Sequence, residues 1–106
     1  MYVVTRSDLS PGLQAAQVLH AGLAFAFEHP DDARAWHDST PWVVVLSVPD
    51  EPALIAHWQR LVDVPHRVLV REPDLGDACT AFAALGFEAG RRLSHLPLAL
   101  KEPQMT

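Results

Sequence analysis

Between Ala15 and Phe27 only two side chains, those of Gln17 and His20, carry hydrogen-bonding groups. A helix that is apolar on nearly every side is usually buried on nearly every side, so this run predicts a long, mostly buried helix. The two polar side chains are three residues apart, which places them on one face where they can contact the same group. We therefore expect a core helix with a single polar edge.

The start of this helix gathers further polar groups. Ser10 stands at the N-cap position and Pro11 at the first helical position, so the helix is expected to run to about Glu28. Just before it, Asp8 follows a short apolar strand at residues 2–6. A carboxylate, an amide and an imidazole therefore belong to one strand-to-helix unit.

The remaining sequence alternates between strand and helix patterns. We expect strands at residues 42–48, 67–71 and 79–84, of which the first is a continuous apolar run typical of a strand covered on both faces. A short helix that begins at Pro30 and a helix capped by Asp50 separate these strands.

This alternation predicts an α/β fold. Strands linked by helices pair in parallel through right-handed crossovers, whereas the last link, of about six residues, is too short for a crossover. The expected architecture is a mixed four-stranded sheet, with three parallel strands and one antiparallel strand, flanked by helices. Parallel strands end at one edge of a sheet, so Asp8 and Asp74 are expected at the same edge.

The composition predicts one globular domain. The chain has 106 residues, of which 49% are hydrophobic, and we expect a single domain over residues 1–100 and a flexible tail at 101–106. No apolar run approaches about 18 residues, and the first residues resemble a strand and not a signal peptide. The lone Cys79 cannot form an internal disulfide, which fits the cytoplasm. No Cys/His spacing suits zinc, and no cofactor is implied.

The net charge is −5 and is unevenly distributed. Residues 28–63 carry seven acidic and two basic side chains, which accounts for the whole excess. We expect these acids on one side of the molecule and five arginines on another, namely Arg6, Arg67, Arg71, Arg91 and Arg92. This separation would permit a polyanion such as RNA to approach, although a charged run is most often only a solvated face.

Two segments resemble a known family. The first contains, in order, Arg6, Asp8-Leu9, Gly12, Ala15-Ala16-Gln17 and His20-Ala21. It is similar to the opening motif of the archaeal and eukaryotic type of peptidyl-tRNA hydrolase, the second of two unrelated hydrolase folds. The second contains Glu72-Pro73-Asp74 and Thr80-Ala81-Phe82-Ala83, which resemble a shortened acidic loop and the Thr-bearing last strand of that family. The resemblance covers residues 2–84.

The resemblance implies hydrolysis of the ester between a peptidyl or aminoacyl carbonyl and the 3′ ribose of tRNA, with the tRNA acceptor end as partner. The catalytic candidates are Asp8, His20, Asp74 and Thr80. One of the two aspartates, Asp8 or Asp74, is expected to activate the water. The substrate-binding candidates are Arg6, Ser10, Gly12, Gln17 and Glu72. We expect Asp8, Gln17 and Asp74 to line one open cleft, with His20 deeper in the fold.

Two departures from the family pattern leave other readings open. The turn from Ser10 to Leu13 has no lysine where the family carries one for catalysis or phosphate contact, and Leu75-Gly76-Asp77 replaces the family's Gly-Arg-Thr. One alternative is a binding protein of the same fold, for RNA or another protein, that has lost hydrolysis. Another is an esterase for a smaller acyl substrate. The candidates also have structural roles open to them, such as a turn cap for Asp8 or a core hydrogen bond for His20. The sequence gives no indication of the oligomeric state.

Overall fold

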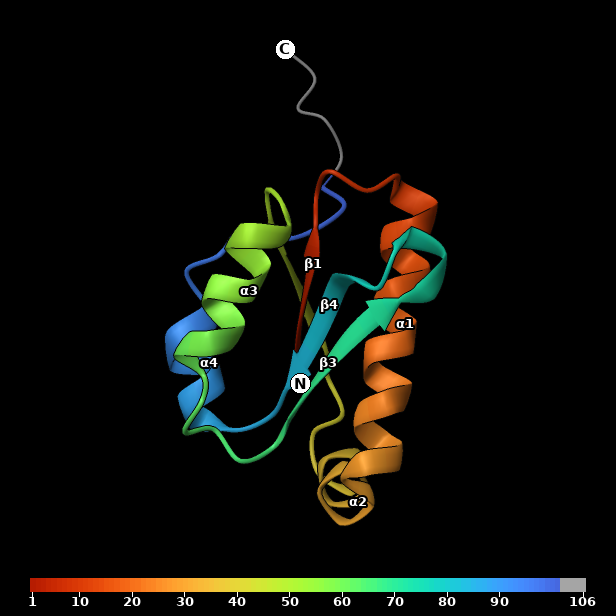
Figure 1. Cartoon of the computed structure of the whole chain (residues 1–106). Coiled ribbons are helices and arrows are strands. Elements are labelled where there is room, and N and C mark those ends of the chain that lie inside the picture. Colours follow the sequence, from red (N-terminus) through yellow and green to blue (C-terminus); the bar gives the residue numbers. More distant parts are fainter. Residues whose placement is uncertain (102–106) are drawn as a thin grey trace.

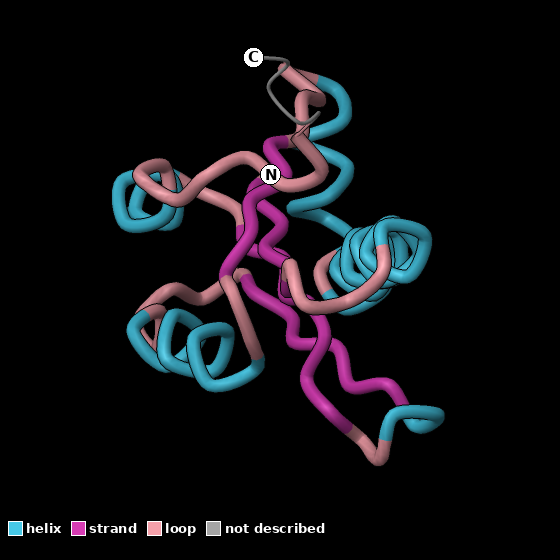
Figure 2. The backbone as a smooth tube through the Cα atoms, turned by 90° about the horizontal axis from the view of Figure 1, so that it is seen from above, coloured by secondary structure: helices cyan, strands magenta, loops and turns pink. Residues whose placement is uncertain are grey.

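A computed structural model describes residues 1–101 as a four-stranded sheet between two layers of helices (Figure 1). The strands are β1 (Tyr2–Arg6), β2 (Val44–Val48), β3 (Arg67–Glu72) and β4 (Ala78–Ala84). The helices are α1 (Pro11–Glu28), α2 (Pro30–Asp38), α3 (Glu51–Arg60) and α4 (Phe87–Leu93), with a 3-10 turn, η1 (Pro73–Leu75), between β3 and β4. Seen from above, α1 and α2 lie on one side of the sheet and α3 and α4 on the other (Figure 2). Beyond Lys101 the expected tail lies outside the described residues.

The strand order is β2-β1-β4-β3. β1 pairs in parallel with β2, whereas β4 is antiparallel to both β1 and β3. The expected set of three parallel strands is therefore wrong, because β4 inserts between β1 and β3 and leaves one parallel pair. β3 still points in the same direction as β1, since both are antiparallel to β4. Both strands end at one edge of the sheet, which we call the carboxyl edge.

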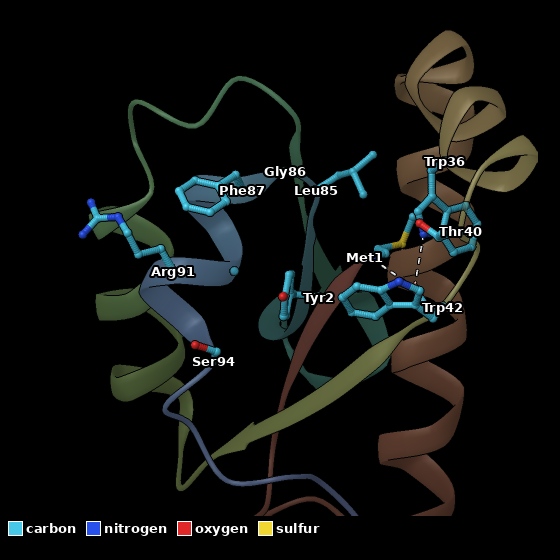
Figure 3. Close-up of a pocket in the computed structure, with 11 residues that line it drawn as sticks. Met1, Tyr2, Trp36, Thr40, Trp42, Leu85, Gly86, Phe87, Arg91 and Ser94 are labelled. Carbon is cyan, nitrogen blue, oxygen red and sulfur yellow. Dashed lines mark hydrogen bonds between the residues drawn. The ribbon is translucent and has the colours of Figure 1, made fainter.

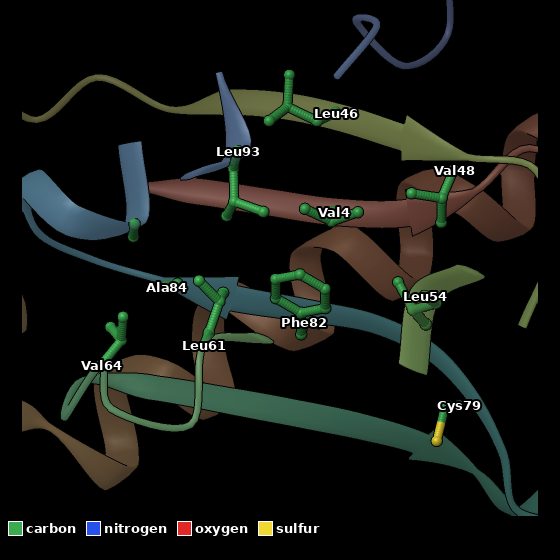
Figure 4. Packing of buried hydrophobic residues seen from close by; sticks show 11 residues of the cluster. Val4, Leu46, Val48, Leu54, Leu61, Val64, Cys79, Phe82, Ala84 and Leu93 are labelled. Carbon is green, nitrogen blue, oxygen red and sulfur yellow. The ribbon is translucent and has the colours of Figure 1, made fainter. Parts of the chain in front are cut away.

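Each face of the sheet has its own apolar core. On the face covered by α3 and α4, Phe82 of β4 is fully buried, and the ring of Trp58 lies 5.7 Å from it between centres. Figure 4 shows Phe82 in the middle of this cluster, with Leu54 and Leu61 close by. On the other face Phe25 of α1 is fully buried against small residues of the sheet. Burial on both faces explains why the strand sequences are apolar without alternation.

A bulge in β4 sets the direction of one candidate residue. Arg71 of β3 pairs with Cys79 and Val70 pairs with Ala81, so Thr80 is the extra residue of the strand. Cys79 consequently joins the core under α3, and the Thr80 hydroxyl faces α1. Bulges often redirect a side chain next to a functional site.

The expected signals at helix starts are confirmed. Ser10 accepts a hydrogen bond from the first turn of α1, and Asp50 does the same for α3. The expected strand at 42–48 begins two residues later, and Trp42 is left 53% exposed. No helix within the described part of the chain is long and apolar enough to cross a bilayer.

The outer side of α1 is exposed, so the expectation of a helix buried on nearly every side is wrong. The sheet-facing residues Gln14, Gln17, Ala21 and Phe25 are buried. On the opposite side Leu19 is 63%, Leu23 50% and Phe27 84% exposed. His20 is exposed as well and does not lie deep in the fold. The physical reason is that α1 packs on the sheet and on α2, and no element covers its outer side (Figure 2).

Candidate functional site

Three hydrogen-bonded side chains connect β4, α1 and β3 near the carboxyl edge. The Thr80 hydroxyl donates to Oε1 of Gln17 over 2.6 Å, and Nε2 of Gln17 donates to Oε2 of Glu72 over 2.9 Å. Thr80 is fully buried and Gln17 is 4% exposed, whereas Glu72 is only partly buried. We call these three residues the polar network. Its amide joins a buried hydroxyl to a carboxylate that solvent reaches.

Backbone contacts hold both ends of the polar network. The hydroxyl of Thr5 donates to the carbonyl oxygen of Thr80 over 3.0 Å, which fixes the bulge against β1. The N–H of Asp74 donates to Oε1 of Glu72 over 3.2 Å, so both carboxylate oxygens accept a hydrogen bond. Thr5 was not among the sequence candidates. A buried polar residue in an otherwise apolar strand is the signal that could have identified it.

The Glu72 carboxylate is ionised at neutral pH and lies within electrostatic range of His20. The pKa of Glu72 is lowered, first by the hydrogen bond from the Asp74 N–H and next by the amide of Gln17, with a smaller contribution from the charge of His20. His20 lies about one turn after Gln17 on α1 and is exposed. An accessible imidazole therefore lies within electrostatic range of an oriented carboxylate.

Replacing Gln17 with leucine is expected to raise the pKa of Glu72, because the amide donor is lost, while the Asp74 N–H still holds that pKa below its ordinary value. A carboxylate with a lowered pKa in the folded state stabilises the fold above its ordinary pKa. That contribution is lost as the pH falls through the lowered value. Side-chain NMR titration measures the shift. Gln14→Leu is the matched control, because Gln14 is buried on the same helix but donates to the Leu9 carbonyl. A Glu72 pKa that is equal in both variants would contradict the assigned contact.

Asp74 lies in η1 at the tip of the β3–β4 hairpin and is exposed. It touches the polar network through its backbone N–H, and Glu72 supplies the side-chain carboxylate there. The structure thus brings together Gln17, Glu72 and Thr80, with His20 nearby, and leaves the Asp74 side chain in solvent.

Asp8 forms a bidentate ion pair with Arg6. Nε of Arg6 donates to Oδ1 of Asp8 over 3.0 Å, and a terminal guanidinium nitrogen donates to Oδ2 over 2.9 Å. The hydrogen bonds from Arg6 lower the pKa of Asp8. Arg6 also donates to the carbonyl of Cys79, the neighbour of Thr80. Asp8 and Arg6 therefore stabilise the carboxyl edge, and both oxygens of Asp8 are already hydrogen-bonded.

The first turn of α1 holds the two remaining candidates. The Ser10 hydroxyl accepts from the N–H of Leu13 over 3.4 Å, so its main contact is the helix cap. Gly12 is exposed, and a Cβ at that position would meet nothing within 4 Å. Both residues lie on the surface beside the carboxyl edge.

The expected separation of charges is wrong. Arg92 pairs with Asp63 of the acidic segment, Arg91 pairs with Glu88, and Arg67 lies over the ring of Trp58. These three arginines lie near the start of β3 and on α4, whereas Arg6 and Arg71 lie near the ends of β1 and β3. At the carboxyl edge, the hydrogen bond to Asp8 raises the pKa of Arg6, burial opposes this, and the charges of Asp8, Glu51 and Asp50 raise the pKa further. The carboxyl edge is therefore rich in acids.

A separate cavity of about 490 Å³ lies at the opposite edge of the sheet. Figure 3 shows Tyr2 of β1, Phe87 of α4 and Trp42 of the loop between α2 and β2 around it. None of the nine candidate residues lines this cavity. Within residues 1–101, no group of three or more His, Cys, Asp or Glu side chains is arranged to hold a metal ion.

No protein-family model matches this chain, and no curated protein matches it either.

Proposed function

We propose that this protein hydrolyses an acyl ester, with the ester between a peptidyl or aminoacyl group and the 3′ ribose of tRNA as its substrate. The observation that supports this best is the hydrogen-bonded chain from Thr80 through Gln17 to Glu72, with the exposed imidazole of His20 within electrostatic range of the carboxylate. These four residues all belong to the segments that resemble the peptidyl-tRNA hydrolases.

In the proposed mechanism His20 is the general base. Its imidazole takes a proton from water, the resulting hydroxide adds to the ester carbonyl carbon, and the bond from that carbon to the ribose oxygen breaks. The proton held by His20 passes to the departing oxygen. The ionised Glu72 stabilises, through its charge, the imidazolium that forms in the first step. Hydrolysis in this form needs no cofactor.

Thr80 and Gln17 act as positioning residues. Because the Thr80 hydroxyl donates to Oε1 of Gln17, the amide can only present its Nε2 to Glu72. This fixes the orientation of the carboxylate beside α1. Thr80 is fully buried and so serves the substrate through Gln17 and Glu72, not by direct contact. Asp8, whose two oxygens are paired with Arg6, is left out of water activation.

The acidic carboxyl edge favours a second candidate, an esterase for a small acyl substrate. Asp8 pairs with Arg6, and Asp50 and Glu51 lie within electrostatic range of it, so the edge offers little attraction to the phosphates of RNA. In this alternative the same four residues perform the chemistry. Only the leaving group differs, and it carries no polyanion.

The test is to incubate the pure protein with peptidyl-tRNA and, in parallel, with p-nitrophenyl acetate. Hydrolysis of the peptidyl-tRNA, with kcat/KM falling steeply as salt rises, supports the tRNA substrate because phosphate contacts release counterions. Hydrolysis of the small ester alone, independent of salt, supports the second candidate. If the protein hydrolyses neither ester, the proposed enzymatic function is overturned, whether or not the protein binds peptidyl-tRNA.

A further inference from the structure

The outer side of α1 presents an unbroken apolar stripe to solvent. Three large residues, Leu19, Leu23 and Phe27, are 63%, 50% and 84% exposed. Two small exposed residues, Gly12 and Ala16, continue the same line toward the start of the helix. The spacings of four, three, four and four residues keep all five on one face. Figures 1 and 2 show no other element against this side of α1. An exposed contiguous apolar surface of this kind marks an interaction site.

We propose that this stripe binds the same stripe of a second copy of the chain, with the two α1 helices antiparallel about a two-fold axis beside Leu19. The argument begins with the order of residue sizes. The stripe is small at its start, where Gly12 and Ala16 lie, and large at its end, where Leu23 and Phe27 lie.

An antiparallel pair matches each large residue with a small one. Phe27 of one copy then faces Gly12 of the other, and Leu23 faces Ala16. Both pairs are possible at once because the midpoint between positions 12 and 27 of the helix is also the midpoint between positions 16 and 23. Space for the Phe27 ring exists, since a Cβ at Gly12 would meet nothing within 4 Å. A parallel pair would instead set Phe27 against Phe27 and leave a gap between the two Gly12 positions, and interfaces pack at interior density.

The charges of α1 favour the same arrangement. The helix has no acidic residue in its first turn and no basic residue in its last turn, and it ends on Glu28. No charged side chain therefore compensates the helix dipole at either end. The carboxylate of Glu28 even lies at the negative end, where a negative charge is unfavourable. In an antiparallel pair the negative end of each α1 helix lies beside the positive start of the other. The two helix dipoles also oppose each other.

The stripe itself carries no charge to repel a copy. A two-fold interface brings the same face of both copies together, so a face with charges of one sign would repel its copy. Between Pro11 and Phe27 the only titratable side chain is His20, at the rim of the stripe. The absence of Lys and Arg from this helix also argues against a lipid surface, which selects amphipathic helices with a basic polar face.

Mass measurement by light scattering after gel filtration tests the dimer. The full chain is expected at twice its monomer mass of 11.7 kDa at micromolar concentrations. Leu19→Lys, which sets two ammonium groups across the axis, is expected to weaken association at least about tenfold and give the monomer mass. Val62→Lys is the matched control, because Val62 is 76% exposed on another surface. A monomer for the unaltered chain at every concentration overturns the proposal, as does an equal effect of both variants.

Two further variants test the antiparallel packing. Gly12→Leu makes the surface more apolar, so it would strengthen nonspecific association. In the proposed dimer it fills the space for Phe27 and is expected to weaken association, and a tighter dimer therefore overturns the packing. The double variant Ala16→Cys/Leu23→Cys is expected to cross-link between copies with a short bis-maleimide, whereas each single cysteine variant is not. Cross-linking of both single variants would indicate a parallel pair and overturn the proposal.

Discussion

Replacing His20 with alanine is expected to lower the rate of ester hydrolysis by about a hundredfold or more, because the water loses its general base. His20 is the exposed member of the site, so the change removes no buried contact and the stability is expected to change by less than about 0.5 kcal/mol. The loss should appear in kcat as well as in kcat/KM, since proton transfer occurs in the transition state. The measurement is steady-state hydrolysis of the better of the two proposed ester substrates.

Controls separate this chemistry from a general effect. His37→Ala removes another exposed imidazole, on α2 and outside the site, and is expected to leave the rate unchanged. Glu72→Gln keeps the size of the side chain but removes the charge that stabilises an imidazolium, so it should lower kcat while leaving the fold intact. Activity of the His20 variant within a factor of about two of the unaltered chain would rule out the proposed base.

Local sequence signals predicted most of the secondary structure. The helix from Pro11 to Glu28 has the expected ends, because the Ser10 cap and the following proline act within a few residues. The strand at 42–48 was placed two residues early, since Trp42 has a strong strand preference but lies before the pairing with β1 begins. Propensity reports what a residue tolerates, whereas pairing depends on residues that are far away in the sequence.

The order of the strands could not be predicted by the same reasoning. Crossover rules give the direction of each strand, and β3 does point the same way as β1. They do not say on which side the β3–β4 hairpin docks. β4 is the strand with the most buried positions, so its central place buries the most apolar surface. The preference of β4 for the central position depends on the packing of both helix layers, so no single segment of the sequence predicts it.

The site was predicted in part. Sequence spacing placed Gln17 and His20 on one face of a helix, whereas the structure has Gln17 buried in the polar network and His20 exposed. The role of Glu72 in place of the Asp74 side chain depends on the turn at η1, which leaves Asp74 in solvent. The direction of Thr80 depends on a bulge, and a bulge cannot be read from the alanine-rich sequence of β4. Helical periodicity also overstated the burial of α1, because an apolar outer face is equally consistent with a buried helix and with an interface.

Replacing Phe82 with alanine is expected to destabilise the fold by about 3–5 kcal/mol, the largest stability effect that we anticipate in this chain. Phe82 is fully buried on β4, a strand with neighbours on both sides, and its ring packs on that of Trp58. The backbone of β4 cannot shift to close the space, because it is paired with both β1 and β3, so the surroundings relax only in part. A domain of this size has a total stability of about 5–15 kcal/mol, so the variant should unfold at a much lower urea concentration. Phe87→Ala is the matched control, because Phe87 is 83% exposed and its loss should cost less than about 0.5 kcal/mol. Equal midpoints for the two phenylalanine variants would mean that the core under α3 does not carry the stability assigned to it.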